Sequence, residues 1–128
     1  MKRILLVDDE KSILFAVRQY FLKQGYTVDC AGTSEQALDL LASEHYCVAI
    51  VDIDLRGSSL PDGLNLAHFI RRHAPATAII ILTALETPET EKRAREAGVH
   101  SLLHKPAPLA QIADVAVRLL SDLSALAV

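Results

Sequence analysis

The segment CVAIVDIDL at residues 47–55 decides the fold, because a continuously apolar run in it stops abruptly at an acidic residue. A strand with one face in water alternates apolar and polar residues, whereas a strand covered on both faces is apolar throughout. The same pattern recurs in AIIIL at residues 78–82. Both segments therefore predict internal strands of a parallel sheet with helices on both faces.

Outward from these two segments, short aliphatic runs alternate with stretches of helical period along the whole chain. The strands are predicted near residues 3–7, 27–31, 47–51, 78–82 and 99–103. Gly25 and Gly98 follow helix-period segments and mark helix ends. Thr33, with a Gln three residues later, predicts a capping box, and Thr87, followed directly by Pro, predicts a helix start. A final helix is expected from Leu109 to Leu126, which leaves no room in this sequence for an output domain after it.

This alternation indicates an α/β fold of a known topology. We predict a flavodoxin-like, doubly wound, five-stranded parallel sheet of order 2-1-3-4-5 with five helices. The chain has 128 residues, of which 51% are apolar and 23% charged. This length and composition indicate one globular domain, which we place at residues 1–128.

The charges and apolar runs exclude several classes of protein. The chain has 13 basic and 16 acidic residues, a net charge of −3, and no basic run longer than the pairs Lys2-Arg3 and Arg71-Arg72, so direct nucleic-acid binding is not expected. Only residues 4–7 are apolar after the basic start, well short of the ~7–15 that a signal peptide needs. No apolar run approaches the ~18 residues of a membrane span, so we expect a cytoplasmic protein with no membrane contact.

Polar side chains collect where the predicted strands end. Asp8 and Asp9 follow the first strand, Asp52 the third, Thr83 the fourth and Lys105 the fifth. Ligands of open α/β sheets bind beyond the carboxyl ends of the strands, at the point where strand order reverses. Three carboxylates packed together need a cation, and an oxygen-only site with room for water suits Mg²⁺. Asp52 is the central carboxylate and is predicted to attack phosphorus, with Thr83 and Lys105 contacting the phosphate oxygens.

The chain resembles a response-regulator receiver domain of bacterial two-component signalling, of the CheY-like family, over essentially its whole length. The resemblance rests on four motifs in order: ILLVDDE at 4–10, CVAIVDIDL at 47–55, IILTA at 80–84 and LLHKP at 102–106. It implies a phosphorylation-controlled switch that accepts a phosphoryl group from a phosphohistidine of a sensor kinase or phosphotransfer protein and then controls an output partner. The protein would catalyse only its own phosphorylation and dephosphorylation.

The resemblance also implies a role for each matched residue. Asp52 would be the phosphoacceptor, Asp9 a direct Mg²⁺ ligand and Asp8 a ligand through water, and the backbone carbonyl of Asp54 would complete the metal shell. Thr83 and Lys105 would hold the phosphoryl oxygens. Two further implications concern their neighbours: Ala84 would leave the phosphoryl group accessible, and the peptide bond before Pro106 would be cis.

Some positions depart from the family pattern or suggest partner surfaces. Leu102 replaces the usual Tyr or Phe of the fifth strand, so we expect the switch to be read through the fourth helix and residues 84–88. The resemblance also implies that a histidine-kinase or phosphotransfer helix pair would dock on an apolar rim that includes Ile13, Ala16, Tyr20, Pro106 and Ala107. In the last helix, Leu109, Ile112, Ala116, Leu119 and Leu123 are predicted to face the core. Its second apolar stripe of Ala113, Val117 and Leu120 suggests a homodimer contact, although broad core burial explains the same pattern.

Other interpretations stay open at this point. Asp52-Ile53-Asp54 superficially matches a haloacid-dehalogenase-like phosphohydrolase, but Arg56 stands where that motif needs Thr or Val. A flavodoxin-like FMN carrier would need Gly, Ser and Thr after the first strand, where this chain is acidic. A receiver-like scaffold that is never phosphorylated, or Asp54 as the acceptor, also fits the pattern. The loop at 56–62 is about three residues longer than in the family, as a surface connection tolerates, and fits a lid, a partner contact or surface drift. Both a free-standing regulator and a domain of a longer chain fit the sequence.

Overall fold

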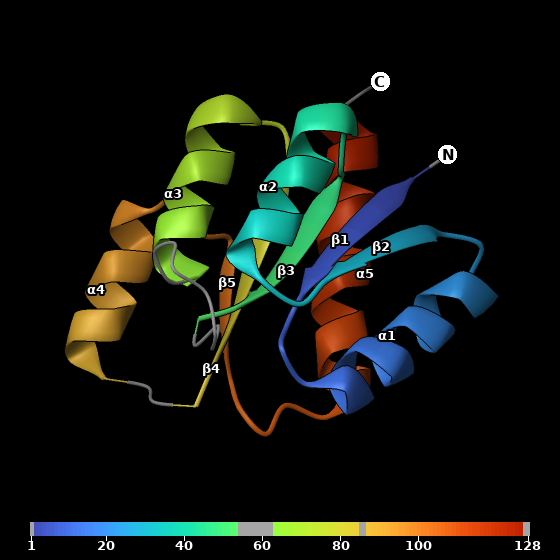
Figure 1. Cartoon of the computed structure of the whole chain (residues 1–128), viewed down its shortest axis with the longest axis horizontal. Helices are drawn as coiled ribbons and strands as arrows, with labels where there is room; N and C mark the ends of the chain where they lie inside the picture. Colours follow the sequence, from blue (N-terminus) through green and yellow to red (C-terminus); the bar gives the residue numbers. More distant parts are fainter. Residues whose placement is uncertain (1, 54–62, 85–86, 127–128) are drawn as a thin grey trace.

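The computed structural model describes residues 2–53, 63–84 and 87–126, with the side chains of the last helix as far as Ser121. Strands and helices alternate along the described chain (Figure 1). In order they are β1 (Arg3–Val7), α1 (Lys11–Lys23), β2 (Thr27–Ala31), α2 (Ser34–Ser43), β3 (Val48–Asp52), α3 (Gly63–His73), β4 (Ala78–Thr83), α4 (Pro88–Glu96), β5 (Ser101–His104) and α5 (Leu109–Leu126).

The five strands form one parallel sheet in the order β2-β1-β3-β4-β5, which confirms the predicted topology. β1 and β3 are neighbours, with Val7 opposite Val51, and β3 and β4 are neighbours, with Asp52 opposite Leu82. Strand order reverses at β1, because the chain first adds β2 on one side and then β3, β4 and β5 on the other. The carboxyl ends of β1, β3 and β4 therefore lie side by side at one edge of the sheet.

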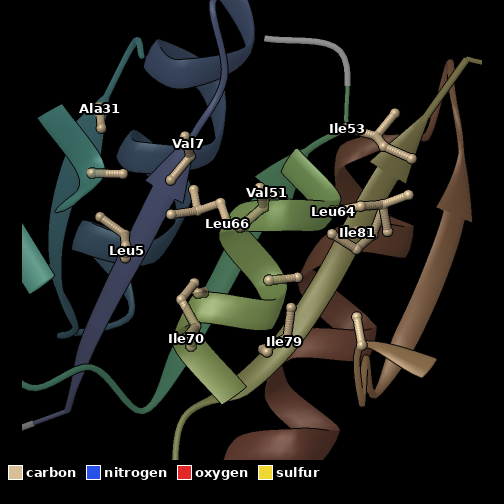
Figure 2. Packing of buried hydrophobic residues seen from close by; sticks show 14 of the residues in the cluster. Leu5, Val7, Ala31, Val51, Ile53, Leu64, Leu66, Ile70, Ile79 and Ile81 are labelled. Carbon is tan, nitrogen blue, oxygen red and sulfur yellow. The ribbon is translucent and has the colours of Figure 1, made fainter. Parts of the chain in front are cut away.

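Helices cover both faces of the sheet, as the continuously apolar strands predict. α2, α3 and α4 lie on one face, and α1 and α5 lie on the other (Figure 1). Successive side chains of each central strand point to opposite faces, so Leu5, Val51 and Ile81 pack with α3 residues Leu64 and Ile70 (Figure 2). The alternate residues of these strands pack against α1 and α5 on the other face. Each internal strand therefore contributes to two separate cores.

The predicted helix ends are confirmed, and one of them corrects the predicted start of β5. Gly98 has φ of +74°, and the N–H of Val99 donates to the carbonyl of Ala94 at 3.1 Å, as in a Schellman motif. Gly25, with φ of +89°, ends α1 in the same way. Because Val99 still belongs to the end of α4, β5 begins at Ser101 and not at residue 99. β3 and β4 likewise end one residue later than predicted.

Side chains and backbone groups also define the helix starts. The hydroxyl of Thr33 accepts the N–H of Gln36 at 3.2 Å, which confirms half of the predicted capping box. The Gln36 amide oxygen accepts a hydrogen bond from the N–H of Gly32 at 2.8 Å, and not from the N–H of Thr33 as a capping box requires. The hydroxyl of Thr87 accepts the N–H of Thr90 at 3.1 Å at the start of α4, as predicted.

The predicted faces of α5 are partly wrong. Ala113 and Leu120 are buried in the core with Ile112 and Ala116, whereas Val117 is 37% exposed. A continuous helix of 3.6 residues per turn turns these four residues toward the sheet together. The stripe of Ala113, Val117 and Leu120 is therefore not a free surface for a homodimer. Leu109 and Leu119 are half-buried, and the side chain of Leu123 lies outside the described residues.

A polar cluster ties strands together at the amino-terminal edge of the sheet, opposite the edge with the acidic residues. Asp29 of β2 accepts hydrogen bonds from Arg3 at 2.9 Å and from the hydroxyl of Tyr46 at 2.7 Å. The backbone carbonyl of Tyr46 accepts the hydroxyl of Thr77, just before β4, at 2.7 Å. Burial of the Tyr46 ring and its hydrogen bond to Asp29 raise the pKa of the phenol. These four residues, which we call the edge clasp, join β1, β2 and the segments that lead into β3 and β4.

No helix in the described ranges combines the length and apolar character needed to cross a bilayer.

Candidate functional site

Three polar side chains that sequence analysis selected are brought together and buried at the carboxyl edge of the sheet. Asp8 directly follows β1, Asp52 ends β3 and Thr83 ends β4, and their residues are 0%, 3% and 1% exposed. Asp8, Asp9 and Asp52 each offer a carboxylate oxygen, and these oxygens all lie within 4.8 Å of one another. The predicted convergence of carboxylates at the strand-order reversal is thus confirmed.

Lys105 closes this group from the segment after β5. Its Nζ lies 3.2 Å from Asp8 Oδ2, 3.2 Å from Asp52 Oδ2 and 3.8 Å from Glu10 Oε1. The Lys105-Pro106 peptide bond is cis, as the resemblance implies. Sequence analysis missed the contact from Glu10, whose only signal was a third consecutive acid after β1.

The electrostatics of the site follow from burial and charge pairing. Burial by itself lowers the pKa of the Lys105 ammonium, but the negative charges of Asp52 and Asp8 outweigh it and raise this pKa above its ordinary value. Lys105 is therefore charged at neutral pH. The three clustered carboxylates outnumber the one ammonium that contacts them, so negative charge is in excess in a largely buried site.

The donor atoms of this cluster fit a metal cation. Asp8 Oδ1 accepts the backbone N–H of Glu10 at 2.9 Å. Asp8 Oδ2 is buried, and within the described residues it faces Lys105 without a hydrogen bond of acceptable geometry. A buried carboxylate oxygen with unused lone pairs is costly in isolation, and a cation that binds it removes that cost. The acidic cluster can therefore hold a metal ion through hard oxygen donors.

The backbone behind Asp52 is packed tightly against the start of α3. The N–H of Ile53 donates to the carbonyl of Leu82 at 2.9 Å, and the N–H of Gly63 donates to the carbonyl of Ile53 at 3.1 Å. A Cβ atom added at Gly63 would lie 2.2 Å from the backbone oxygen of Asp52. The sequence pattern does not indicate this close approach, because it joins two segments whose separation periodicity does not report.

The predicted partner rim forms a real pocket beside the acidic cluster. A pocket of about 560 Å³ lies between α1, the segment after β5 and the start of α5. Its apolar lining includes Ile13, Ala16, Pro106, Ala107 and Leu109, and Glu10, Ser12 and Lys105 provide polar atoms. Tyr20, which was assigned to the same rim, does not line this pocket and packs edge-on against Phe21.

The remaining predicted site residues lie near the site or outside the described chain. Ala84 is exposed directly after Thr83 and lines the same pocket as Ile13. Leu102 is half-buried in β5 and packs against the core beneath α3 and α4. Asp54 and the long loop at 56–62 lie outside the described residues.

Comparisons with known proteins agree with this site and fold. A protein-family model described as "Response regulator receiver domain" matches residues 4–117. The response regulator RppA of Synechocystis sp. is 35% identical over 112 residues, which are 86% of this chain and 47% of RppA. A CheY-like receiver domain protein of Methanospirillum hungatei has a TM-score of 0.90 at 26% identity and covers 97% of both chains.

A second solved structure, a Burkholderia pseudomallei response regulator described with a phosphorylated aspartic acid and a calcium ion, has a TM-score of 0.79 at 27% identity. The match covers 88% of this chain and 64% of the Burkholderia pseudomallei chain. The chain spans about half the length of RppA and about two thirds of the Burkholderia pseudomallei chain. From the family match, the sheet order and the buried acidic cluster together, the chain belongs to the response regulator receiver domain family, the phosphoryl-accepting switches of two-component systems.

Proposed function

We propose that Asp52 accepts a phosphoryl group from a phosphohistidine of a sensor kinase or phosphotransfer protein, and that the change in shape controls an output partner. The observation that carries this proposal is the position of the Asp52 carboxylate. It is 3% exposed at the end of the central strand, with an ammonium 3.2 Å away and two further carboxylates beside it. The protein then acts as a switch, and its catalysis is limited to its own phosphorylation and dephosphorylation.

The chemistry requires one bond to form and one to break. A carboxylate oxygen of Asp52 bonds to phosphorus, while the phosphorus–nitrogen bond of the donor histidine breaks and its electron pair returns to the imidazole. Lys105 and the hydroxyl of Thr83 lie at the same edge and are proposed to contact the oxygens of the transferred group. Asp8, Asp9, Asp52 and the backbone carbonyl of Asp54 would hold Mg²⁺, which neutralises charge on those oxygens when bound.

The place of Asp52 in the fold supports this function over phosphohydrolysis. The haloacid-dehalogenase motif belongs to the first strand of a larger chain, whereas Asp52 ends β3. The phosphorylated aspartic acid and the calcium ion named for the Burkholderia pseudomallei structure support an acceptor carboxylate and a divalent cation in this chain too.

Incubation with acetyl phosphate or phosphoramidate and Mg²⁺ is expected to increase the intact mass by about 80 Da, the mass of one phosphoryl group. The same incubation with a chelator is expected to give no increase, because the excess of carboxylates over ammonium groups at the site repels an anionic donor. Intact-protein mass spectrometry measures both. No increase in any condition would replace the switch with a receiver-shaped scaffold that is never phosphorylated.

The pocket between α1 and the segment after β5 is proposed as the docking site of the phosphohistidine partner. It opens beside Lys105 and is mainly apolar, so a partner helix that fills it would bring a histidine close to Asp52. A partner bound in this pocket could contact α1 and the acidic cluster at the same time.

Ile13→Asp is expected to slow phosphotransfer from a partner kinase by about tenfold or more, because it places a charge in the apolar lining. Phosphorylation by acetyl phosphate should stay close to that of the unmodified protein, since Ile13 carries no part of the acidic cluster. The rates are compared by mass spectrometry and by transfer of labelled phosphate. Leu22→Asp, on α1 but outside the pocket lining and 39% exposed, is the matched control and should leave both rates unchanged. If Ile13→Asp lowered the phosphorylation rate equally with the kinase and with acetyl phosphate, the docking site would lie elsewhere.

The output is proposed to be read at α4 and at residues 84–88, which adjoin Thr83. Leu102 lacks the aromatic ring whose movement reports phosphorylation in many family members. We therefore propose that α4, which lies beside β5, reports phosphorylation in its place. Contraction of the Thr83 segment toward a phosphorylated Asp52 would move the start of α4, because Thr83 and Thr87 are only four residues apart.

A further inference from the structure

A histidine side chain takes the place of a backbone group where β5 begins. The N–H of Ile79 in β4 donates to His100 Nδ1 at 3.0 Å, and the N–H of His100 donates to the carbonyl of Ile79 at 2.9 Å. The two residues thus form a closed pair of hydrogen bonds, one through the imidazole and one through the backbone. Because Nδ1 accepts, the neutral ring carries its proton on Nε2.

The geometry of the sheet explains why a side chain is needed here. In a parallel ladder extended in the β4–β5 register to the residues before Ser101, the N–H of Ile79 would donate to the carbonyl of Val99. Val99 instead belongs to the end of α4, where its N–H donates to the carbonyl of Ala94 beside the left-handed Gly98, so the chain has not yet joined the ladder at that residue. Ile79 is fully buried, and an unpaired buried N–H is costly. The imidazole of His100 removes this cost only while it is neutral.

Charged groups from two helices surround this imidazole. The Arg71 side chain of α3 packs against Gly98: a Cβ atom added to Gly98 would lie 2.8 Å from Arg71 Nε. Glu91 and Arg95 of α4 line a pocket of about 380 Å³ together with His100. His100 is exposed as a whole residue, but the partial desolvation of its ring lowers its pKa, and the positive charge of Arg71 lowers this pKa further.

We propose that His100 is a protonation switch for the α4–β5 corner, which we define as residues 97–101. With neutral His100 the corner is closed on Ile79. A proton on Nδ1 turns the acceptor into a donor that faces the N–H of Ile79, so the pair separates and the corner opens. The pocket between α4 and β5, of which His100 and Ser101 form one wall, changes shape with it.

The direction of the effect follows from proton binding. Because the folded protein binds this proton less readily than the unfolded chain, whose histidine titrates near pH 6.5, the closed corner is fully stable above about pH 6.5. Its stability falls as the pH decreases below that value. The switch therefore responds to acidification.

The test is amide hydrogen exchange of Ile79 in the unphosphorylated chain, measured by NMR between about pH 7.5 and about pH 5 together with the titration of His100. After correction for intrinsic exchange, protection of Ile79 should fall below about pH 6.5 by up to about tenfold per pH unit, and should level off once His100 is protonated in the folded protein. His100→Asn keeps an amide oxygen near the position of Nδ1 and cannot titrate, so its protection should not depend on pH. His100→Ala should leave Ile79 poorly protected at every pH.

Two further variants separate this switch from general acid sensitivity. Arg71→Gln removes the positive charge beside the ring and should move the midpoint of His100 and of Ile79 exchange to higher pH together. His45→Asn, in an exposed segment before β3, is the matched control and should change neither. The proposal is overturned if protection of Ile79 is constant while His100 titrates, or if His100→Asn retains the full pH dependence.

Discussion

Asp52→Asn is expected to abolish the mass increase of about 80 Da that acetyl phosphate and Mg²⁺ produce. Asn has nearly the shape of Asp, so the 3% exposed site at the end of β3 keeps its packing. It has no anionic oxygen to attack phosphorus, and it weakens the ion pair that holds Lys105 3.2 Å away. Intact-protein mass spectrometry over a time course measures the loss directly.

Two matched variants show whether the loss belongs to Asp52 alone. Asp54→Asn should retain uptake, because the proposed metal ligand at this position is the backbone carbonyl, which a change of side chain leaves in place. Asp39→Asn, an exposed carboxylate of α2, should behave like the unmodified protein. An Asp52→Asn protein that still gains mass, together with loss in Asp54→Asn, would move the acceptor to Asp54.

Gly63→Ala is expected to lower the free energy of unfolding by about 2 kcal/mol. The new Cβ would lie 2.2 Å from the oxygen of Asp52 and 2.8 Å from Cα of Ile53, and both atoms are backbone that cannot rotate away. Overpacking of this kind costs about 3 kcal/mol, which exceeds the gain of about 1 kcal/mol from Ala over Gly in a helix. Urea unfolding measures the net effect.

Gly32→Ala provides the matched comparison for this substitution. Its added Cβ would lie 3.6 Å from the Gln36 side chain and 4.0 Å from the Asp8 carbonyl, which are ordinary contacts. Its stability should change by no more than about 0.5 kcal/mol. Phosphoryl uptake should be slower in Gly63→Ala than in Gly32→Ala, because Asp52 must shift to admit the methyl group. Equal stability of the two variants would show that α3 does not press on the Asp52 carbonyl in solution.

The sheet and the acidic cluster could be predicted because both follow from local patterns and one topological rule. Uninterrupted apolar strands indicate a parallel sheet, and its order places the residues after β1, β3 and β4 at one edge. Asp8, Asp52 and Thr83 were therefore identified from their positions alone. The two glycines at the ends of α1 and α4 were identified because a left-handed residue there has a strong chemical preference.

Other features depend on distances between segments, which periodicity does not contain. The contact of Glu10 with Lys105 depends on how the segment after β5 folds back, and that of Gly63 on how close α3 lies to β3. The faces of α5 were partly wrong because nearly every side of this helix is apolar, so the pattern leaves its rotation undefined. Ala113 and Leu120 are buried because the sheet selects that rotation.

The edge clasp gives the sheet one anchored end and one end that is free to respond. Asp29 is bonded to both Arg3 and Tyr46, and the carbonyl of Tyr46 is bonded to Thr77, so the amino-terminal ends of the strands are cross-linked. A charge change at Asp52 acts at the opposite end of the same strands. Displacements of these strands should be larger at the end that carries the acidic cluster than at the end that the edge clasp cross-links. We therefore expect phosphorylation to move the loops around the acidic cluster while the clasped end stays in place as the fixed reference for that movement.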